Sequence, residues 1–173
     1  MILRKTLQRW ALIAPVLLVA YGITVIFPSV AHADNTRLND GVFSDIYTAQ
    51  RRNNCTTEPR VNGRLVDAAR RHAIDLLDHP DVNGDIGSDG STPGERARDA
   101  GFAGEVAETI AVNPALAISG SEILNQWWRD PPSRATMQDC NNTAIGVWSV
   151  NSLARTIVVA LYGQPSTTSS SER

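Results

Sequence analysis

Hydrophobic residues recur at a helical spacing in three parts of the chain. Between residues 38 and 52 and between residues 63 and 77, apolar side chains return about every 3.6 positions, which predicts two amphipathic helices. Pro80 follows the second stripe and predicts its end. A third amphipathic segment extends from Ser119 to Arg129, and Pro131-Pro132 predicts its end.

A further helix start follows a turn-rich loop that spans residues 81–90. Thr92 is the expected N-cap, Pro93 occupies the first helical position and Glu95 the third. This spacing is that of a capping box, in which the two side chains bond to each other's backbone N–H groups. Gly101 is the expected C-terminal glycine of this helix.

The extended segments come mostly late in the chain. Residues 105–112 favour a short strand. Residues 143–150 and 155–162 are rich in β-branched and aromatic side chains and flank Asn151-Ser152, which predicts a hairpin. Helices early and strands late are typical of an α+β domain.

The first 33 residues have the three parts of a secretory signal peptide. Three bases precede an uncharged apolar run from Ala11 to Phe27, and an A-x-A pattern ends at Ala33. The alternative is a retained membrane anchor, because the run is just long enough to span a bilayer. We favour cleavage after Ala33. The chain then divides into a stub (34–37), one domain (38–163) and a disordered Ser/Thr-rich tail (164–173).

Cleavage leaves an acidic protein. Three of the sixteen bases lie before the cut and all eighteen acids follow it, so the remaining chain has a net charge of −5. Nucleic acids and anionic membranes attract basic patches. We therefore expect neither as the main partner, and contact with a membrane only through the signal peptide.

Two cysteines remain, Cys55 and Cys140. A distant pair in an exported protein predicts a disulfide bond. The alternative, a reactive thiol, would need a nearby base and would leave the second cysteine unexplained.

Several motifs, in one order, resemble bacterial members of the CAP superfamily (cysteine-rich secretory, antigen 5 and pathogenesis-related proteins, with an SCP-like domain). They are GSDGSTPGER at 87–96, AGF at 100–102, AETIA at 107–111, WWRDPPSR at 127–134 and IGV at 145–147. The resemblance implies a three-layer α-β-α sandwich with a small antiparallel sheet. The absence of lysine beyond Lys5 and the stretch 113–120 most resemble the secreted mycobacterial and actinobacterial branch.

The resemblance also implies a cavity in which family members place two histidines and two acids, a set able to bind zinc. The matching positions here are Asp85, Glu95, Glu108 and Ser133, so both acids remain and both histidines are replaced. Imidazole is a preferred zinc ligand, and hard ions such as calcium require more oxygen ligands than this set offers. We therefore expect no metal and no cofactor.

Glu95 and Glu108 allow two interpretations. Two clustered carboxylates without a cation can share a proton, which would suit proton transfer in catalysis. Alternatively, Glu95 serves the capping box and Glu108 is held by hydrogen bonds to backbone. We favour the structural interpretation, and name both residues as the only catalytic candidates.

Other candidate sites have simpler explanations. His72 and His79 lack the i, i+4 spacing of a metal-binding pair. Asp81, Asn83 and Asp85 begin like a calcium loop and Asp89 adds a further acid, but Ile86 and Thr92 occupy positions that need glycine and glutamate, so a turn is favoured. Trp127 and Trp128 are adjacent on a helix and cannot both face the core.

The expected protein is thus a secreted or cell-envelope CAP-like domain whose cavity lacks histidine. We expect a non-catalytic binding or interaction module, with lipids or apolar small molecules as candidate ligands and a protein partner that the sequence does not identify. A metal-independent hydrolase using Glu95 and Glu108 is one alternative. A wall-associated structural or antigenic protein is the other.

Overall fold

The computed structural model describes residues 35–114 and 118–166. The predicted signal peptide and residues 167–173 of the predicted tail lie outside this range. The described elements are α1 (Thr36–Arg52), β1 (Arg60–Val61), α2 (Gly63–Asp78), α3 (Pro93–Asp99), β2 (Gly104–Asn113), α4 (Gly120–Arg129), α5 (Pro131–Gln138), β3 (Ala144–Asn151) and β4 (Thr156–Pro165). None of the helices in these ranges is long and apolar enough to cross a membrane.

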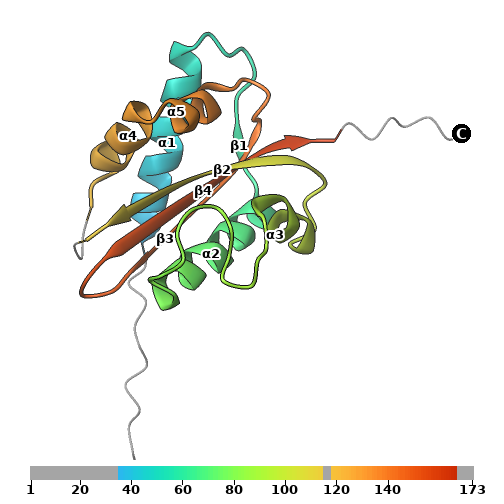
Figure 1. The fold of residues 1–173 in the computed structure, drawn as a ribbon. Helices are drawn as coiled ribbons and strands as arrows, with labels where there is room; N and C mark the ends of the chain where they lie inside the picture. Colours follow the sequence, from blue (N-terminus) through green and yellow to red (C-terminus); the bar gives the residue numbers. More distant parts are fainter. Residues whose placement is uncertain (1–34, 115–117, 167–173) are drawn as a thin grey trace, which may run out of the picture. The chain divides into compact units, whose positions relative to one another are not determined.

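The four strands form one sheet between two layers of helices. The strand order is β1-β3-β4-β2, with α2 and α3 on one face and α1, α4 and α5 on the other (Figure 1). The long strands β2 and β3 both pair antiparallel with β4. This arrangement confirms the predicted α-β-α sandwich. It has one strand that was not predicted, β1, which pairs parallel with β3.

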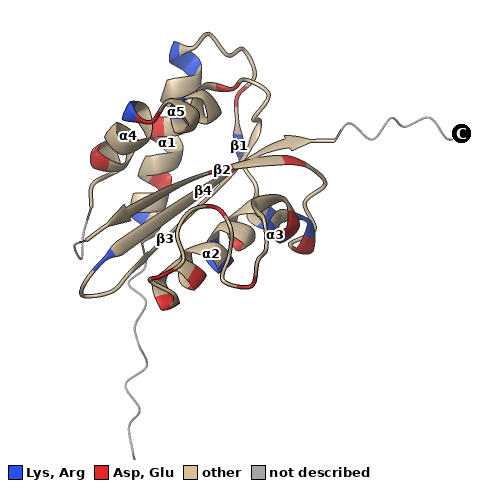
Figure 2. Ribbon diagram, viewed as in Figure 1, with Lys and Arg blue, Asp and Glu red and all other residues tan. Residues whose placement is uncertain are grey.

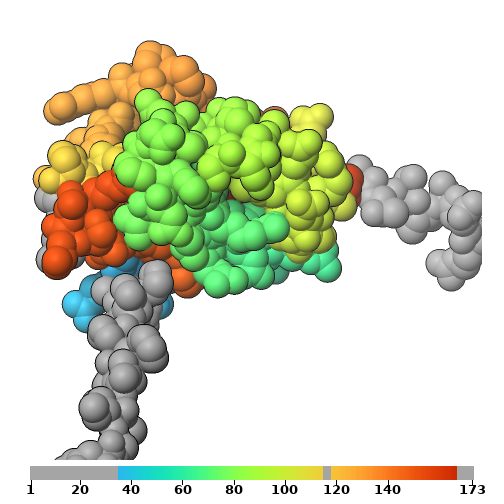
Figure 3. Space-filling view, turned by 60° about the horizontal axis from the view of Figure 1, so that its bottom comes forward, coloured from blue at the N-terminus to red at the C-terminus, as the bar shows by residue number. Residues whose placement is uncertain are grey.

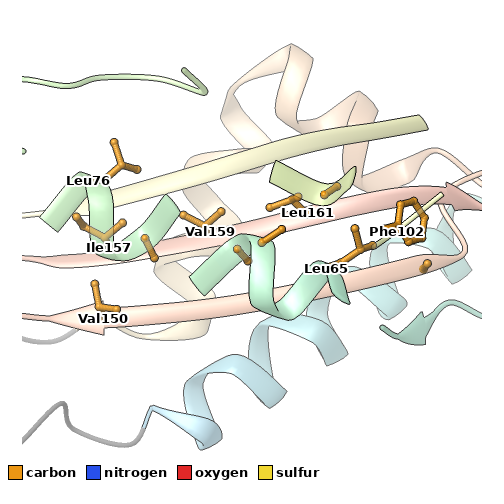
Figure 4. Packing of buried hydrophobic residues seen from close by; sticks show 12 residues of the cluster. Leu65, Leu76, Phe102, Val150, Ile157, Val159 and Leu161 are labelled. Carbon is orange, nitrogen blue, oxygen red and sulfur yellow. The ribbon is translucent and has the colours of Figure 1, made fainter. Parts of the chain in front are cut away.

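Strand β4 connects the two hydrophobic cores. Ile157, Val159 and Leu161 pack with Leu65, Leu76 and Phe102 on the α2 side of the sheet (Figure 4). Val158, Ala160 and Tyr162 pack on the other side with residues of α1, α4 and α5. Successive side chains of a strand point to opposite faces, so a strand covered on both faces is apolar throughout. This explains the unbroken hydrophobic run of β4.

Two glycines let α2 lie directly on the sheet. A Cβ on Gly146 of β3 would overlap the main chain of α2 at Leu65 and Val66. A Cβ on Gly163 of β4 would lie 2.8 Å from Cδ1 of Leu65. The first turn of α2 therefore sits closer to the sheet than any side chain at Gly146 would allow.

The local helix signals are mostly confirmed. Thr92 and Glu95 form the predicted capping box of α3, and Gly101 follows this helix with φ +86°. Helix α1 begins two residues earlier than expected, within the predicted stub.

One helix was not predicted, and one strand boundary was wrong. Pro131-Pro132 ends α4 as expected, but it also begins α5, a helix that was not predicted. Proline suits the first helical positions because an N–H there would have no partner within the helix. Gln164 and Pro165, assigned to the tail, belong to β4 and pair with Glu105 and Gly104.

The predicted Cys55–Cys140 disulfide is confirmed. It joins the segment after α1 to the turn after α5. Next to it, the buried side chain of Gln50 donates to the carbonyls of Asp139 and Asn142, at 3.1 and 2.9 Å. The bond therefore ties two turns that hydrogen bonds already hold together.

Replacing both cysteines with alanine should lower the free energy of unfolding by about 4 kcal/mol, because an 85-residue loop is no longer closed in the unfolded chain. Urea denaturation of the double variant measures this loss. The wild type under reducing conditions should show the same shift. An unchanged midpoint in both would contradict a structural role.

Gly146→Ala should destabilise the fold by about 3 kcal/mol or more, because the added methyl group meets the backbone of α2. Gly41→Ala is the matched control. Gly41 lies in α1 with open space where a Cβ would be, so alanine there should stabilise by about 0.5–1 kcal/mol. Thermal denaturation compares the two, and equal melting temperatures would refute the close packing of α2 on β3.

Candidate functional site

A buried ionic cluster lies between the sheet and the α2–α3 layer. Nδ1 of His72 lies 3.0 Å from Oε2 of Glu108. Nη2 of Arg96 donates to the same carboxylate, at 3.0 Å to Oε2 and 3.3 Å to Oε1. The side chains of His72, Glu108 and Arg96 are 0, 1 and 6% exposed. The cluster is therefore closed to solvent.

Three elements bring these side chains together. His72 lies on the inward stripe of α2, among Ala69, Ala73 and Leu76, where every side chain is buried. Glu108 shares a face of β2 with Val106 and Ile110, both packed against the core on the α2 side. Arg96 is the first buried residue of α3, one position after the capping-box glutamate. The cap fixes the start of α3 and so directs Arg96 inward.

Arg96 also holds the loop between α2 and α3. Its Nη2 donates to the carbonyl oxygen of Asp85 at 2.7 Å, and its Nη1 donates to that of Ser91 at 2.6 Å. Nη2 of Arg71 in turn donates to the carbonyl oxygen of Arg96 at 2.5 Å. One guanidinium thus joins α3, the loop and β2, beside α2.

The hydrogen bonds favour one proton arrangement. Nη2 of Arg96 has two protons, which the carbonyl of Asp85 and the carboxylate of Glu108 take up. Nδ1 of His72 then donates its own proton to Glu108, although it also lies 2.9 Å from Nη2. Nε2 of His72, which has no partner among the described residues, is left as an unprotonated acceptor. An orphan acceptor costs less than an orphan N–H. In this arrangement His72 and Arg96 both donate to Glu108.

Glu95 does not belong to this cluster. Its carboxylate is exposed and accepts hydrogen bonds from the backbone N–H and hydroxyl of Thr92, at 2.9 and 2.8 Å. These bonds lower the pKa of Glu95 below its ordinary value. The predicted capping role of Glu95 is confirmed. Backbone hydrogen bonds were expected for the carboxylate of Glu108. Its partners are instead the side chains of His72 and Arg96.

Asp85 and Ser133, the two positions that the resemblance matches to histidine, make local contacts of their own. Asp85 is exposed, and its backbone carbonyl rather than its carboxylate meets Arg96. The hydroxyl of Ser133 donates to Oδ2 of Asp130 at 2.6 Å, within the N-terminal cap of α5, and this contact lowers the pKa of Asp130.

These four residues do not fit a metal ion. Both glutamates already accept hydrogen bonds, and Ser133 is bound to its own helix cap. Among the described residues, no group of three or more His, Cys, Asp or Glu side chains is placed to hold one.

The remaining sequence candidates occupy local structures. His79 is half exposed, with Nε2 3.7 Å from Oδ1 of Asp75. Burial raises the pKa of Asp75, but hydrogen bonds from Ser88 outweigh this effect and the net shift is downward. Oδ1 of Asp89 accepts from the backbone N–H of Ser91, and Gly84 and Gly90 have positive φ, so the calcium-like loop is a series of turns.

The burial of Arg96 and the pairing of His72 with Glu108 were not predicted from the sequence. A histidine within an apolar helical stripe was the available signal for His72, since a buried polar group requires a partner. For Arg96 there was no such signal, because arginine is rarely buried and the residue follows an exposed cap.

A shallow groove lies on the other side of the sheet, between α1 and α4. It encloses about 270 Å³ and is lined by Asp45, Thr48, Ala49, Arg52, Leu124, Asn125 and Trp128. Trp127 is 2% exposed and packs in the core, whereas Trp128 is 39% exposed. The prediction that only one tryptophan faces inward is thus confirmed, and the other lies at the groove.

The layered fold is an α-β-α sandwich, and the closed cluster buries the carboxylate of Glu108 between the sheet and the α2–α3 layer. The profile of the CAP family, the cysteine-rich secretory protein family, matches residues 49–162. The chain therefore belongs to the CAP family.

Solved structures share this fold. An outer surface protein of Borrelia burgdorferi is 19% identical with a TM-score of 0.68, covering 78% of this chain and 98% of its own. An extracellular SCP-domain protein of Bacillus anthracis is 16% identical with a TM-score of 0.64; the match covers 75% of this chain but 41% of that protein. NaASP2, solved with Zn²⁺, is 8% identical with a TM-score of 0.54, covering 79% of this chain and 83% of its own. Curated proteins give no match.

Arg96→Met should lower the free energy of unfolding by about 3–5 kcal/mol, because it leaves Glu108 buried without its cation. Arg98→Met is the matched control: Arg98 is exposed on the same helix, and its loss should change stability by at most about 0.5 kcal/mol. Urea denaturation measures both. Equal effects of the two substitutions would contradict the structural role of the cluster.

Proposed function

We propose that this protein is an exported CAP-domain module that binds a lipid or another apolar molecule and carries out no hydrolysis. The observation that supports this most strongly is the closure of the His72–Glu108–Arg96 cluster. Glu108 accepts hydrogen bonds from two side chains and is 1% exposed. A general acid or base must come within hydrogen-bond reach of the substrate proton, which this burial prevents.

The second candidate acid offers no alternative catalyst. The carboxylate of Glu95 is exposed but already satisfied by Thr92, and hydrogen bonding keeps its pKa low. A carboxylate with a low pKa is a weak base at neutral pH. Catalysis by Glu95 and Glu108 together would require the capping box of α3 and the buried cluster to open at the same time.

The groove between α1 and α4 is the proposed ligand site. Its apolar lining comes from Ala49, Leu124 and Trp128, and Arg52 lies among the lining residues near the end of α1. Large, partly exposed aromatic rings give much contact area for little loss of side-chain freedom. An elongated acyl chain matches a shallow trough between two helices better than a compact polar ligand does.

The proposed place of action is outside the cytoplasm. The sequence supports this through the predicted signal peptide, and the disulfide bond is of a kind that persists in oxidising compartments. Two proteins of the same fold are named for an outer-surface or extracellular location. Acidic residues are spread over helices on both faces of the sheet (Figure 2), which suits a freely diffusing protein better than one adsorbed to anionic lipid.

Bromododecanol, a neutral chain whose bromine quenches tryptophan at contact, is the test ligand. We expect saturable quenching in the wild type and a roughly tenfold weaker affinity in Leu124→Asp, because a carboxylate replaces one of the three apolar side chains that line the groove. Trp128→Phe should keep the affinity, measured by calorimetry, but lose most of the quenching.

Leu153→Asp provides the control, since Leu153 is 92% exposed at the tip of the β3–β4 hairpin and lies outside the groove. It should bind like the wild type. Equal binding by Leu124→Asp and the wild type would refute the groove. If neither the wild type nor any variant bound bromododecanol, the proposal that the protein binds an apolar ligand would be wrong.

A further inference from the structure

A second hollow lies on the opposite face of the sheet, beside the C-terminal end of α2. It encloses about 500 Å³ and is lined by Leu76, Pro80, Asp81, Val82, Asn83, Gly84, Ile110, Val112 and Arg155. Small-molecule sites usually enclose about 300–1,000 Å³. The hollow therefore has room for a ligand of modest size.

The wall formed by the sheet and α2 is apolar. Ile110 and Val112 are two positions apart on β2, so their side chains lie on the same face of the sheet. Leu76 of α2 belongs to the hydrophobic core on this face. Val112 is 47% exposed, which leaves a large aliphatic side chain open to solvent at the end of β2. Figure 3 shows α2 and the loop after it covering this side of the molecule as one surface.

Arg155 places a positive charge at this wall. Its Nη2 donates to the carbonyl oxygens of Leu76 and Leu77 at the end of α2, and these bonds fix the orientation of the guanidinium. No carboxylate among the described residues lies within 4.0 Å of Arg155. Two backbone carbonyls offset the charge only in part, so an anion near the remaining nitrogen atoms would be attracted.

The opposite wall is polar and exposed. It consists of the loop from Pro80 to Gly84, where Asp81 is the one acid that lines the hollow. The side chain of Asp81 is exposed to solvent, so its repulsion of a bound anion is screened. The partly buried Arg155 acts through a lower dielectric and has the larger effect on a bound charge.

We propose that this hollow binds a small apolar molecule that carries a carboxylate. The aliphatic part contacts Val82, Ile110 and Val112, and the carboxylate pairs with the guanidinium of Arg155. This site is separate from the α1–α4 groove, and its ligand is distinguished by its charge and short chain. The interaction with Arg155 supplies the selectivity for an anion, because apolar contacts alone do not distinguish an acid from an alcohol.

Octanoate, octanol and octylamine test the proposal as probes of equal length and different charge. Amide chemical shifts of the full domain should move around Val82, Ile110 and Val112, with octanoate binding about tenfold more tightly than octanol and octylamine more weakly still. Stronger binding of octylamine would show that Asp81 dominates and would overturn the proposal.

Three variants separate binding from folding. Arg155→Gln should lose the preference for octanoate over octanol. Because Arg155 also caps α2, Val112→Glu is added: this half-exposed position tolerates a charge, and octanoate should bind about tenfold more weakly with an unchanged melting temperature. Asp81→Asn should strengthen octanoate binding two- to threefold, roughly the effect of one screened charge.

Asp40→Asn on exposed α1 is the control and should not alter octanoate binding. Leu124→Asp in the α1–α4 groove distinguishes the two sites, because it should leave the octanoate-induced shifts around Val82, Ile110 and Val112 unaltered. If Val112→Glu and Asp81→Asn both behave as wild type, the hollow is not the site. If only Leu124→Asp weakens octanoate, the anion binds in the groove, which overturns this proposal but leaves the proposed function standing.

Discussion

The burial of one guanidinium constrains the whole α2–α3 side of this molecule. Burial of Arg96 is costly unless its charge is matched and most of its N–H groups find acceptors, as those of Nη1 and Nη2 do here. Glu108 supplies the charge, and the carbonyls of Asp85 and Ser91 take up further donors. The loop between α2 and α3 must therefore follow a path that brings these carbonyls to Arg96. The position of α3, the course of the loop and the pairing of His72 all depend on this one side chain.

This constraint also bears on Glu108, which the resemblance matches to a cavity acid of the family. The resemblance implies that family members can gather two acids around a metal ion, which neutralises them. A carboxylate that stays in such a place without a metal requires another cation. Here Arg96 provides it for Glu108, and Glu95 remains at the surface where Thr92 and water solvate it. The same contacts that stabilise the carboxylate of Glu108 also enclose it among side chains.

The features that could be predicted from the sequence are those set by residues close together in the chain. The capping box of Thr92 and Glu95, the hairpin around Asn151 and the rule that two adjacent tryptophans cannot both face the core follow from local spacing. The structure confirms each. The two-residue strand β1 is too short to leave a pattern, and Pro131-Pro132 signals an end and a start equally well. Arg96 was missed because its burial depends on Glu108, which another element brings close.

The two proposed binding regions lie on opposite faces of the sheet, and β4 separates them. Its side chains alternate between the two cores, and both faces are fully buried along Ile157 to Tyr162. A ligand in the α1–α4 groove can influence the hollow beside α2 only by moving this strand, whose neighbours β2 and β3 pair with it along its length. Closely packed layers resist such movement. Coupling between sites requires an element with two arrangements, and a strand held on four sides is a poor candidate. The sheet should therefore keep the two sites energetically independent, so that one domain presents two unrelated surfaces.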